Sequence, residues 1–431
     1  MITPRQKVLL QIAMGTLVAA NVTMLALLFA KRRFAGPGGD ESFFLRMVEQ
    51  FRDQPYQTMA SGCSVPYAGI GAALSAIGLP TLNTLRALSL VCIPFILGGI
   101  FFLARNLIGL SRMGCWLAGL TGLNALTGSI YFNYAISDPL HIAILIWLFV
   151  LLLVMLKDNN NGIRFPVYCG LLTALALATR PSTILYFPGI LAIIVIAAFV
   201  GRTVIPLKKG LVAFFVGSII LILLQLPPIW EHHGFRFENK NPSETLTWSQ
   251  QNYLTMLMRK GGSITSPQRS SWADTRRYLE EHGSNSLPTN ELETIVFDPN
   301  AVAKASLMHF FIQEPYVLLR RCGFLFVAVL VGALSFVILR LRNMRQFSPW
   351  EQLVVLVLAF LIALSGVILL DIEWRWMIPA VLLVNVIGMK CIENLKTGQH
   401  TRLYWSVVVG QLLFLTVSKG YDFWSIVGMK F

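Results

Sequence analysis

The chain has 431 residues, of which 55% are hydrophobic and 13% are charged, and its mean hydropathy is +0.65. Soluble globular proteins carry about twice this share of charged residues, so the composition excludes a soluble domain and indicates an integral membrane protein. The net charge of +14 would also suit a nucleic-acid-binding protein, but about half of the basic residues lie in short loops between apolar segments and the long segment 229–321 is neutral, so no nucleic-acid partner is expected.

Apolar segments that approach or exceed the roughly 20 residues needed to cross a bilayer recur along the chain. In chain order, the eleven spans that we predict are 8–30, 86–104, 113–133, 139–156, 165–180, 183–200, 210–228, 322–339, 353–370, 376–390 and 404–418. The first is too long for a cleaved signal peptide and no small-residue cleavage pattern follows it. The predicted fold is an all-α polytopic membrane bundle, with transmembrane modules at 1–228 and 322–431 on either side of a long loop at 229–321.

The basic residues of the short loops indicate the topology. Fifteen of them lie on the side of the N-terminus and two, Arg180 and Arg375, lie on the opposite side. Because Lys and Arg are retained on the cytoplasmic side during insertion, we expect a cytoplasmic N-terminus. The cluster Lys31-Arg32-Arg33 disagrees with this assignment and is outweighed by the other loops. Segments 31–85 and 229–321 are therefore expected outside the cytoplasm, by default on the periplasmic side of a bacterial inner membrane.

The two outer segments have different predicted roles. Segment 229–321 holds ten basic and ten acidic residues and short amphipathic pieces, which favour a small, neutral helical cap. In segment 31–85, an amphipathic helix follows Asp40 and is expected to lie at the membrane interface, its aromatic face in the lipid or on the bundle. His232-His233 is the one histidine pair and lacks the ligand spacing of zinc sites, so we expect neither a metal nor a cofactor.

Charged residues recur at the outer ends of the predicted spans. Because a charge in hydrocarbon is costly, such residues tend to line a cavity or a pathway. We expect them to meet in one reaction site at the outer membrane interface. They are Asp40 and Glu41, Asp138 in "YFNYAISDPL", Arg180 in "ATRPST", and Asp371, Glu373 and Arg375 in "LDIEWRWMIP".

Structural roles for the same residues stay open at this point. Asp40 follows two glycines and precedes an amphipathic helix, a typical N-cap position. Asp138 precedes Pro139 and could cap the next span. Arg375 lies between two tryptophans and could be an interfacial anchor.

Several of these motifs, in their order, resemble the GT-C glycosyltransferase superfamily, and most of all the branch with the lipid A aminoarabinose transferases and bacterial enzymes related to protein O-mannosyltransferases. The resemblance rests on "GGDESFFLRMVEQF", "SVPYAGIGAALSAIG", "YAISDPL", "HFFIQEPYVLLRR" and "RWMIP". It implies a GT-C-like bundle and transfer of a monosaccharide from a polyprenyl-phosphate donor in the outer leaflet to a glycan, lipid or protein acceptor. It assigns the catalytic acidic role to Asp40 and the second functional aspartate to Asp138. One departure is Ser64-Val65, where the aminoarabinose transferases have a glutamate-lysine pair.

The chemistry of the transfer predicts the same residues. A lipid phosphate leaves as a stable anion, so the enzyme needs a base for the acceptor and a cation for the phosphate. We predict Asp40 as the base, with direct displacement inverting the anomeric centre. Arg375 is the first candidate for the cation, followed by Arg180 and Arg86, and Glu41 or Asp138 would orient the sugar or the acceptor.

Two other function classes remain open. A transporter or flippase would also use buried charges and proline-broken helices, although we find no inverted repeat. A polymerase or ligase of undecaprenyl-linked glycans would place arginines and a histidine in the large outer loop, and His282 and His309 lie in that loop.

Overall fold

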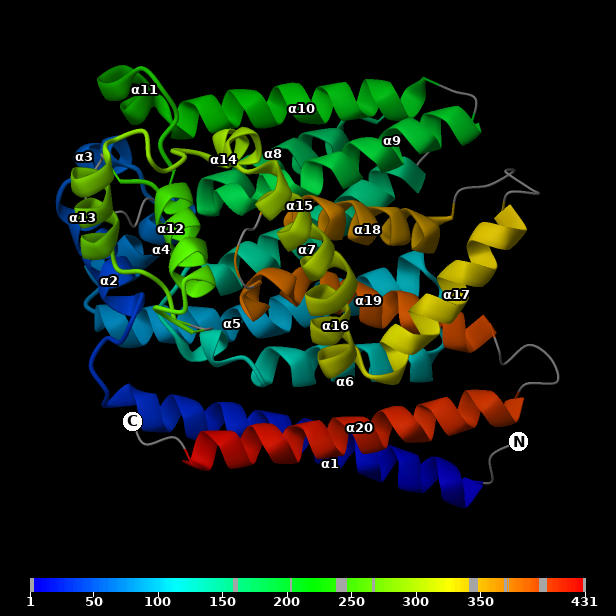
Figure 1. Ribbon diagram of the computed structural model, residues 1–431. Coiled ribbons are helices and arrows are strands. Elements are labelled where there is room, and N and C mark those ends of the chain that lie inside the picture. The colour runs from blue at the N-terminus through cyan, green and yellow to red at the C-terminus, as the bar shows by residue number, and fades with distance from the viewer. Residues whose placement is uncertain are drawn as a thin grey trace.

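The computed structural model describes residues 4–157, 162–201, 204–237, 246–265, 268–340, 348–367, 370, 372–394 and 401–428. Within these ranges every regular element is a helix. Most of the long helices run nearly side by side (Figure 1). The predicted all-α polytopic architecture is confirmed. Asp371 lies outside the described residues.

Eight stretches of the described chain are long and apolar enough to cross a membrane. They are built on α1 (Pro4–Arg33), α5 (Thr81–Phe102), α7 (Asp138–Lys157), α9 (Phe187–Gly201), α10 (Ile205–Leu224), α18 (Pro349–Val367), α19 (Trp374–Asn394) and α20 (Thr401–Gly428). Two of them are extended by the π-helix η1 (Leu103–Leu107) after α5 and by the 3₁₀ helix η3 (Pro181–Tyr186) before α9.

The other three predicted spans fall on shorter helices of 16, 16 and 17 residues, namely α6 (Arg112–Thr127), α8 (Arg164–Thr179) and α17 (Phe324–Arg340). The span predicted at 113–133 ends early, because α6 stops at Thr127 and the 3₁₀ helix η2 (Ile130–Asn133) follows.

The first outer segment folds into three short helices, α2 (Glu41–Asp53), α3 (Pro55–Ser61) and α4 (Val65–Ala76). The apolar face of α2 is buried, and Phe44 and Val48 pack with Tyr67 of α4 and Leu85 of α5. Of the two positions expected for this face, lipid or bundle, the structure therefore shows the bundle. This packing fixes the turn before α2, which carries Asp40, against the ends of the spans.

The second outer segment contains α11 (Leu226–His232), α12 (Trp248–Lys260), α13 (Trp272–His282), α14 (Glu291–Phe297), α15 (Pro299–Met308), the π-helix η4 (His309–Gln313) and α16 (Glu314–Cys322). A small core of Tyr253, Leu254 and Leu287 holds its first part together. In Figure 1, α12 and α13 lie at one end of the bundle, whereas α15 and α16 run across the direction of the spans. η4 and α16 pack against α18 and α19.

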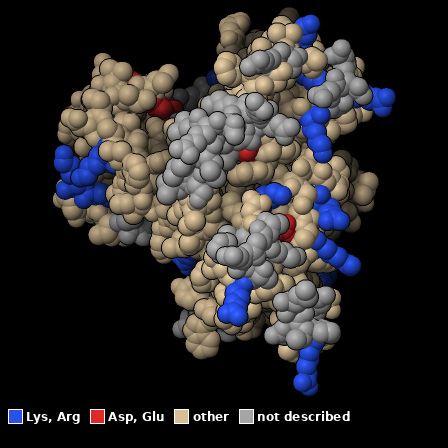
Figure 2. All heavy atoms as spheres, turned by 90° about the vertical axis from the view of Figure 1, so that its right-hand side faces the viewer, with Lys and Arg blue, Asp and Glu red and all other residues tan. Residues whose placement is uncertain are grey.

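Figure 2 shows the face of the molecule on which the N-terminus of Figure 1 lies. Lys and Arg side chains are spread over it, and few Asp or Glu side chains are visible. This is the distribution that a cytoplasmic N-terminus requires. The orientation itself remains a prediction.

Candidate functional site

Arg375, the second residue of α19, lies among three carboxylates, two of which come from distant parts of the chain. Its Nη1 atom is 3.2 Å from Oδ2 of Asp40 and 3.7 Å from Oδ2 of Asp138. Its Nε atom is 2.6 Å from Oε2 of Glu373. The guanidinium group also lies over the ring of Tyr131, 5.3 Å from the ring centre. Arg375 is thus ion-paired and held in place rather than extended as a simple interfacial anchor.

Asp40 is the most exposed of the three carboxylates of this group. Its side chain is 42% exposed, whereas that of Asp138 is 6% exposed. Asp40 occupies the N-cap position of α2, yet its side chain makes no capping hydrogen bond and instead accepts a hydrogen bond from Nη1 of Arg375. The preceding turn depends on Gly39, whose φ of +56° is a conformation that other residues rarely adopt.

Asp138 is held by Arg180. Nη2 of Arg180 donates to Oδ2 of Asp138 at 2.6 Å, and Nε donates to Oγ of Ser137 at 3.1 Å. Asp138 is the first residue of α7, and Arg180 follows the last residue of α8. Two helix ends therefore fix one carboxylate between the guanidinium groups of Arg180 and Arg375.

Glu41 and Arg86 form a separate, fully buried network beside this group. Arg86 donates to both carboxylate oxygens of Glu41 at 2.8 Å, and the same carboxylate accepts from the backbone N–H of Gly38 at 3.0 Å and of Ala135 at 2.9 Å. Burial raises the pKa of Glu41, but the hydrogen bonds from Arg86 and the two backbone groups outweigh it, so the pKa of Glu41 is lower than usual. Both side chains are engaged by the protein itself.

Two residues of the site had no predicted role. Glu373 was part of the expected cluster without an assigned function, and it forms the link between Arg375 and Arg269 of the outer segment, whose Nη2 donates to Oε1 of Glu373 at 3.2 Å. Arg269 carries no signal in the sequence, because it is one of ten basic residues in a neutral polar loop. The whole group balances three arginines against three carboxylates.

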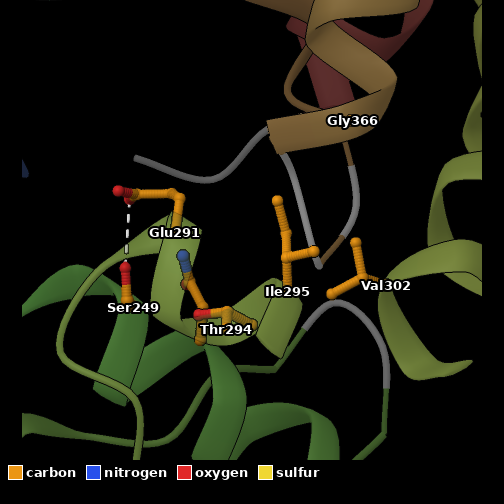
Figure 3. A pocket seen from close by; sticks show the side chains of 7 residues that line it. Ser249, Glu291, Thr294, Ile295, Val302 and Gly366 are labelled. Atoms are coloured by element: carbon orange, nitrogen blue, oxygen red, sulfur yellow. Dashed lines mark hydrogen bonds between the residues drawn. The ribbon is translucent and has the colours of Figure 1, made fainter. Parts of the chain in front are cut away.

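A small pocket that is not lined by any residue of this group lies between α12, α14 and α15 and the end of α18 (Figure 3). Oγ of Ser249 donates to Oε1 of Glu291 at its rim, at 3.1 Å, and Ile295 and Val302 supply apolar walls. The described residues contain no group of three or more His, Cys, Asp or Glu placed to hold a metal ion.

At the sequence level the chain matches no protein-family model, and no curated protein matches it. Among solved structures it is similar to the archaeal oligosaccharyltransferase AglB from Archaeoglobus fulgidus in complex with an inhibitory peptide and a dolichol-phosphate, with a TM-score of 0.53 and 11% identity over 94% of this chain and 56% of that one. It is also similar to ArnT from Cupriavidus metallidurans bound to undecaprenyl phosphate, with a TM-score of 0.47 and 12% identity over 92% of this chain and 62% of that one. The chain thus spans less than two thirds of the length of either protein. The similarity to the oligosaccharyltransferase, with its TM-score above 0.5, supports the GT-C-like fold that the sequence predicts.

Proposed function

We propose that the chain is an inverting glycosyltransferase that moves a monosaccharide from a polyprenyl-phosphate donor to a glycan, lipid or protein acceptor at the outer face of the membrane. The observation that carries this proposal is the contact between Asp40, an accessible carboxylate, and Arg375, a guanidinium group held by three acids. A base and a phosphate-binding cation then lie side by side at the ends of the spans. A bacterial inner membrane with this site on the periplasmic side is part of the same proposal.

In this mechanism Asp40 accepts the proton of the acceptor hydroxyl or amine while the acceptor attacks the anomeric carbon. The bond from that carbon to the phosphate oxygen breaks, and its electron pair leaves with the lipid phosphate. Arg375 stabilises the departing anion, because a guanidinium group matches phosphate oxygens in geometry and charge. Attack opposite to the leaving group inverts the anomeric centre.

The remaining residues of the predicted site take different roles in the proposal. Asp138, paired with Arg180, keeps Arg375 beside Asp40 and can accept a hydrogen bond from a sugar hydroxyl. Glu41 and Arg86, first expected to bind substrate, are better suited to holding the turn before α2, because their polar atoms bond to each other and to the backbone.

Substitution of Arg375 tests the proposal directly. With purified protein in liposomes and a radiolabelled polyprenyl-phosphate sugar, we expect Arg375→Gln to lower transfer by about 10²–10³-fold, the usual cost of removing one donor to a developing anion. Arg375→Lys keeps the charge without the planar fork and should recover part of the rate. Arg46→Gln, an exposed arginine of α2, is the matched control and should transfer normally. Normal transfer by Arg375→Gln would exclude the assigned role.

Arg269 should contribute much less than Arg375. Its pair with Glu373 is partly exposed on both sides, and such pairs are worth about 0.2–1 kcal/mol. We expect Arg269→Gln to lower kcat/KM by no more than about fivefold. Steady-state kinetics on the same liposomes measure this, and a hundredfold loss would mean that Arg269 itself contacts the reacting groups.

The same assay separates the other two function classes. A flippase would move intact donor across the vesicle without releasing free polyprenyl phosphate. A polymerase or ligase that uses His282 or His309 would lose activity when these are changed. In the structure the ring of His282 stacks on Tyr278 and His309 pairs with Gln313, contacts that belong to the outer segment and not to the Arg375 group.

A further inference from the structure

A second group of charged side chains lies inside the bundle, where α1, α6, α16 and α20 meet. Lys419 and Asp422 of α20 are only 5% and 7% exposed. Nζ of Lys419 donates to Oγ1 of Thr127 at 2.7 Å and lies 3.7 Å from Sδ of Met24. Arg321 of α16 completes the group through Asp422. α20 packs against α1 and crosses it in the view of Figure 1.

The positive charge of this group exceeds its negative charge. Among the described residues, two cations, Arg321 and Lys419, share one carboxylate, that of Asp422, at 3.8 and 4.0 Å, which is much longer than the roughly 2.7–2.9 Å of a strong charged hydrogen bond. A third cation, Arg320, is exposed next to them and lies over the ring of Tyr421. Uncompensated charge among membrane spans is costly, so an additional anion would be favourable here.

The surroundings indicate how such an anion would arrive. The backbone of Gly128 lies directly under the charged ends, because a Cβ there would overlap Oδ2 of Asp422 and lie 2.7 Å from Nη1 of Arg321. The ring of Trp374 covers Arg321 from the side of α19, at 4.5 Å. The outward face of α20 is apolar and aromatic, and Trp424 is exposed on it. An anion that reaches the group beside Arg320 and Tyr421 would therefore have this apolar face next to it, which suits a molecule with an apolar tail.

We propose that Arg320, Arg321 and Lys419 bind the phosphate of a membrane lipid, at a site distinct from the Arg375 group. Trp374 lies between the two sites, since its ring contacts Arg321 and its chain neighbour is Arg375. Two sources share this chemistry: an anionic phospholipid headgroup and a free polyprenyl phosphate. The inference concerns lipid binding and holds whether or not the chain transfers sugar.

Binding to lipid nanodiscs of defined composition tests the site. The full chain is reconstituted in phosphatidylcholine alone, with added phosphatidylglycerol, or with added undecaprenyl phosphate, and bound anionic lipid is quantified by native mass spectrometry. We expect Lys419→Met to weaken binding of the anionic lipid by about tenfold or more, as the loss of a hydrogen bond to a charged group implies. Arg320→Gln, at an exposed position that folding tolerates, should weaken it by about threefold, as an exposed charge contact implies. Lys304→Met removes an exposed cation of α15 and should bind as the unmodified chain does.

Asp422→Asn separates the lipid site from a purely structural ion-pair group. It removes the acid that is paired with Arg321 and Lys419 and that competes with the phosphate, so we expect tighter anionic lipid binding. A purely structural ion-pair group would instead lose stability without binding more lipid. If Lys419→Met weakens the binding of both lipids, the site is a general site for anionic lipid headgroups. If it weakens the binding of undecaprenyl phosphate alone, the site is specific for the polyprenyl phosphate. Either result supports the proposal. Unchanged binding of both lipids by Lys419→Met and Arg320→Gln, or weaker binding by a folded Asp422→Asn, overturns it. Neither result depends on a transfer assay.

Discussion

Asp40→Asn is expected to lower sugar transfer by about 10²–10⁴-fold, the usual contribution of a general base, while the protein is still made and inserted. The amide cannot accept the proton of the acceptor. It has nearly the same shape and is an equally good N-cap, so α2 should form as before. Initial rates of transfer from a labelled polyprenyl-phosphate sugar to endogenous acceptors in membranes measure the effect.

Two further variants distinguish catalysis from capping. Asp40→Ser is also a good N-cap and should be as inactive as Asp40→Asn if the carboxylate is the base. Asp53→Asn removes an exposed carboxylate at the other end of α2 and is the matched control, with the rate expected to stay within twofold, about the effect of an exposed ion pair. If Asp40→Asn transfers at a near-normal rate while binding of the donor is unchanged, the base lies elsewhere and the mechanism fails.

The convergence of Asp40, Asp138, Arg180 and Arg375 could be predicted from the sequence because topology alone brings them together. Asp138, Arg180 and Arg375 lie at the ends of predicted spans and Asp40 lies in the outer segment that follows the first span, and the basic loops put all four on one side of the membrane. The ends of packed antiparallel spans are neighbours in space, and the structure shows the resulting ion pairs. Their roles in a reaction remain a proposal.

The separation of Asp40 from Glu41 could not be predicted in the same way. Adjacent residues at a helix start point about 100° apart, so one carboxylate can face the site while the next faces the core. Which one does so depends on the buried position of Arg86, one turn into α5. The sequence also could not predict that α15 and α16 run across the direction of the spans. These helices have 10 and 9 residues, which is too short for a membrane span, and nothing in their sequences indicates their direction.

Glu41→Gln is expected to destabilise the protein by about 3–5 kcal/mol, the cost of breaking one side of a buried ion pair. Arg86 would keep a buried charge with only neutral partners, the remaining amide oxygen and three backbone carbonyls, and the link from the turn before α2 to α5 would be weakened. The thermal unfolding midpoint in detergent measures the effect. Glu49→Gln makes the same chemical change at an exposed position of α2 and should leave the midpoint nearly unchanged.

The pH dependence of the unmodified protein should report the same pair. Because folding lowers the pKa of Glu41 below its ordinary value of 4.5, the stabilising contribution is complete above that pH and is lost as the pH falls through the lower value in the folded protein. The midpoint difference between the unmodified chain and Glu41→Gln should therefore shrink on acidification. Arg86→Met added to Glu41→Gln removes the unpaired charge and should restore part of the stability. A Glu41→Gln protein as stable as the unmodified chain would show that the buried pair does not hold the turn that carries Asp40.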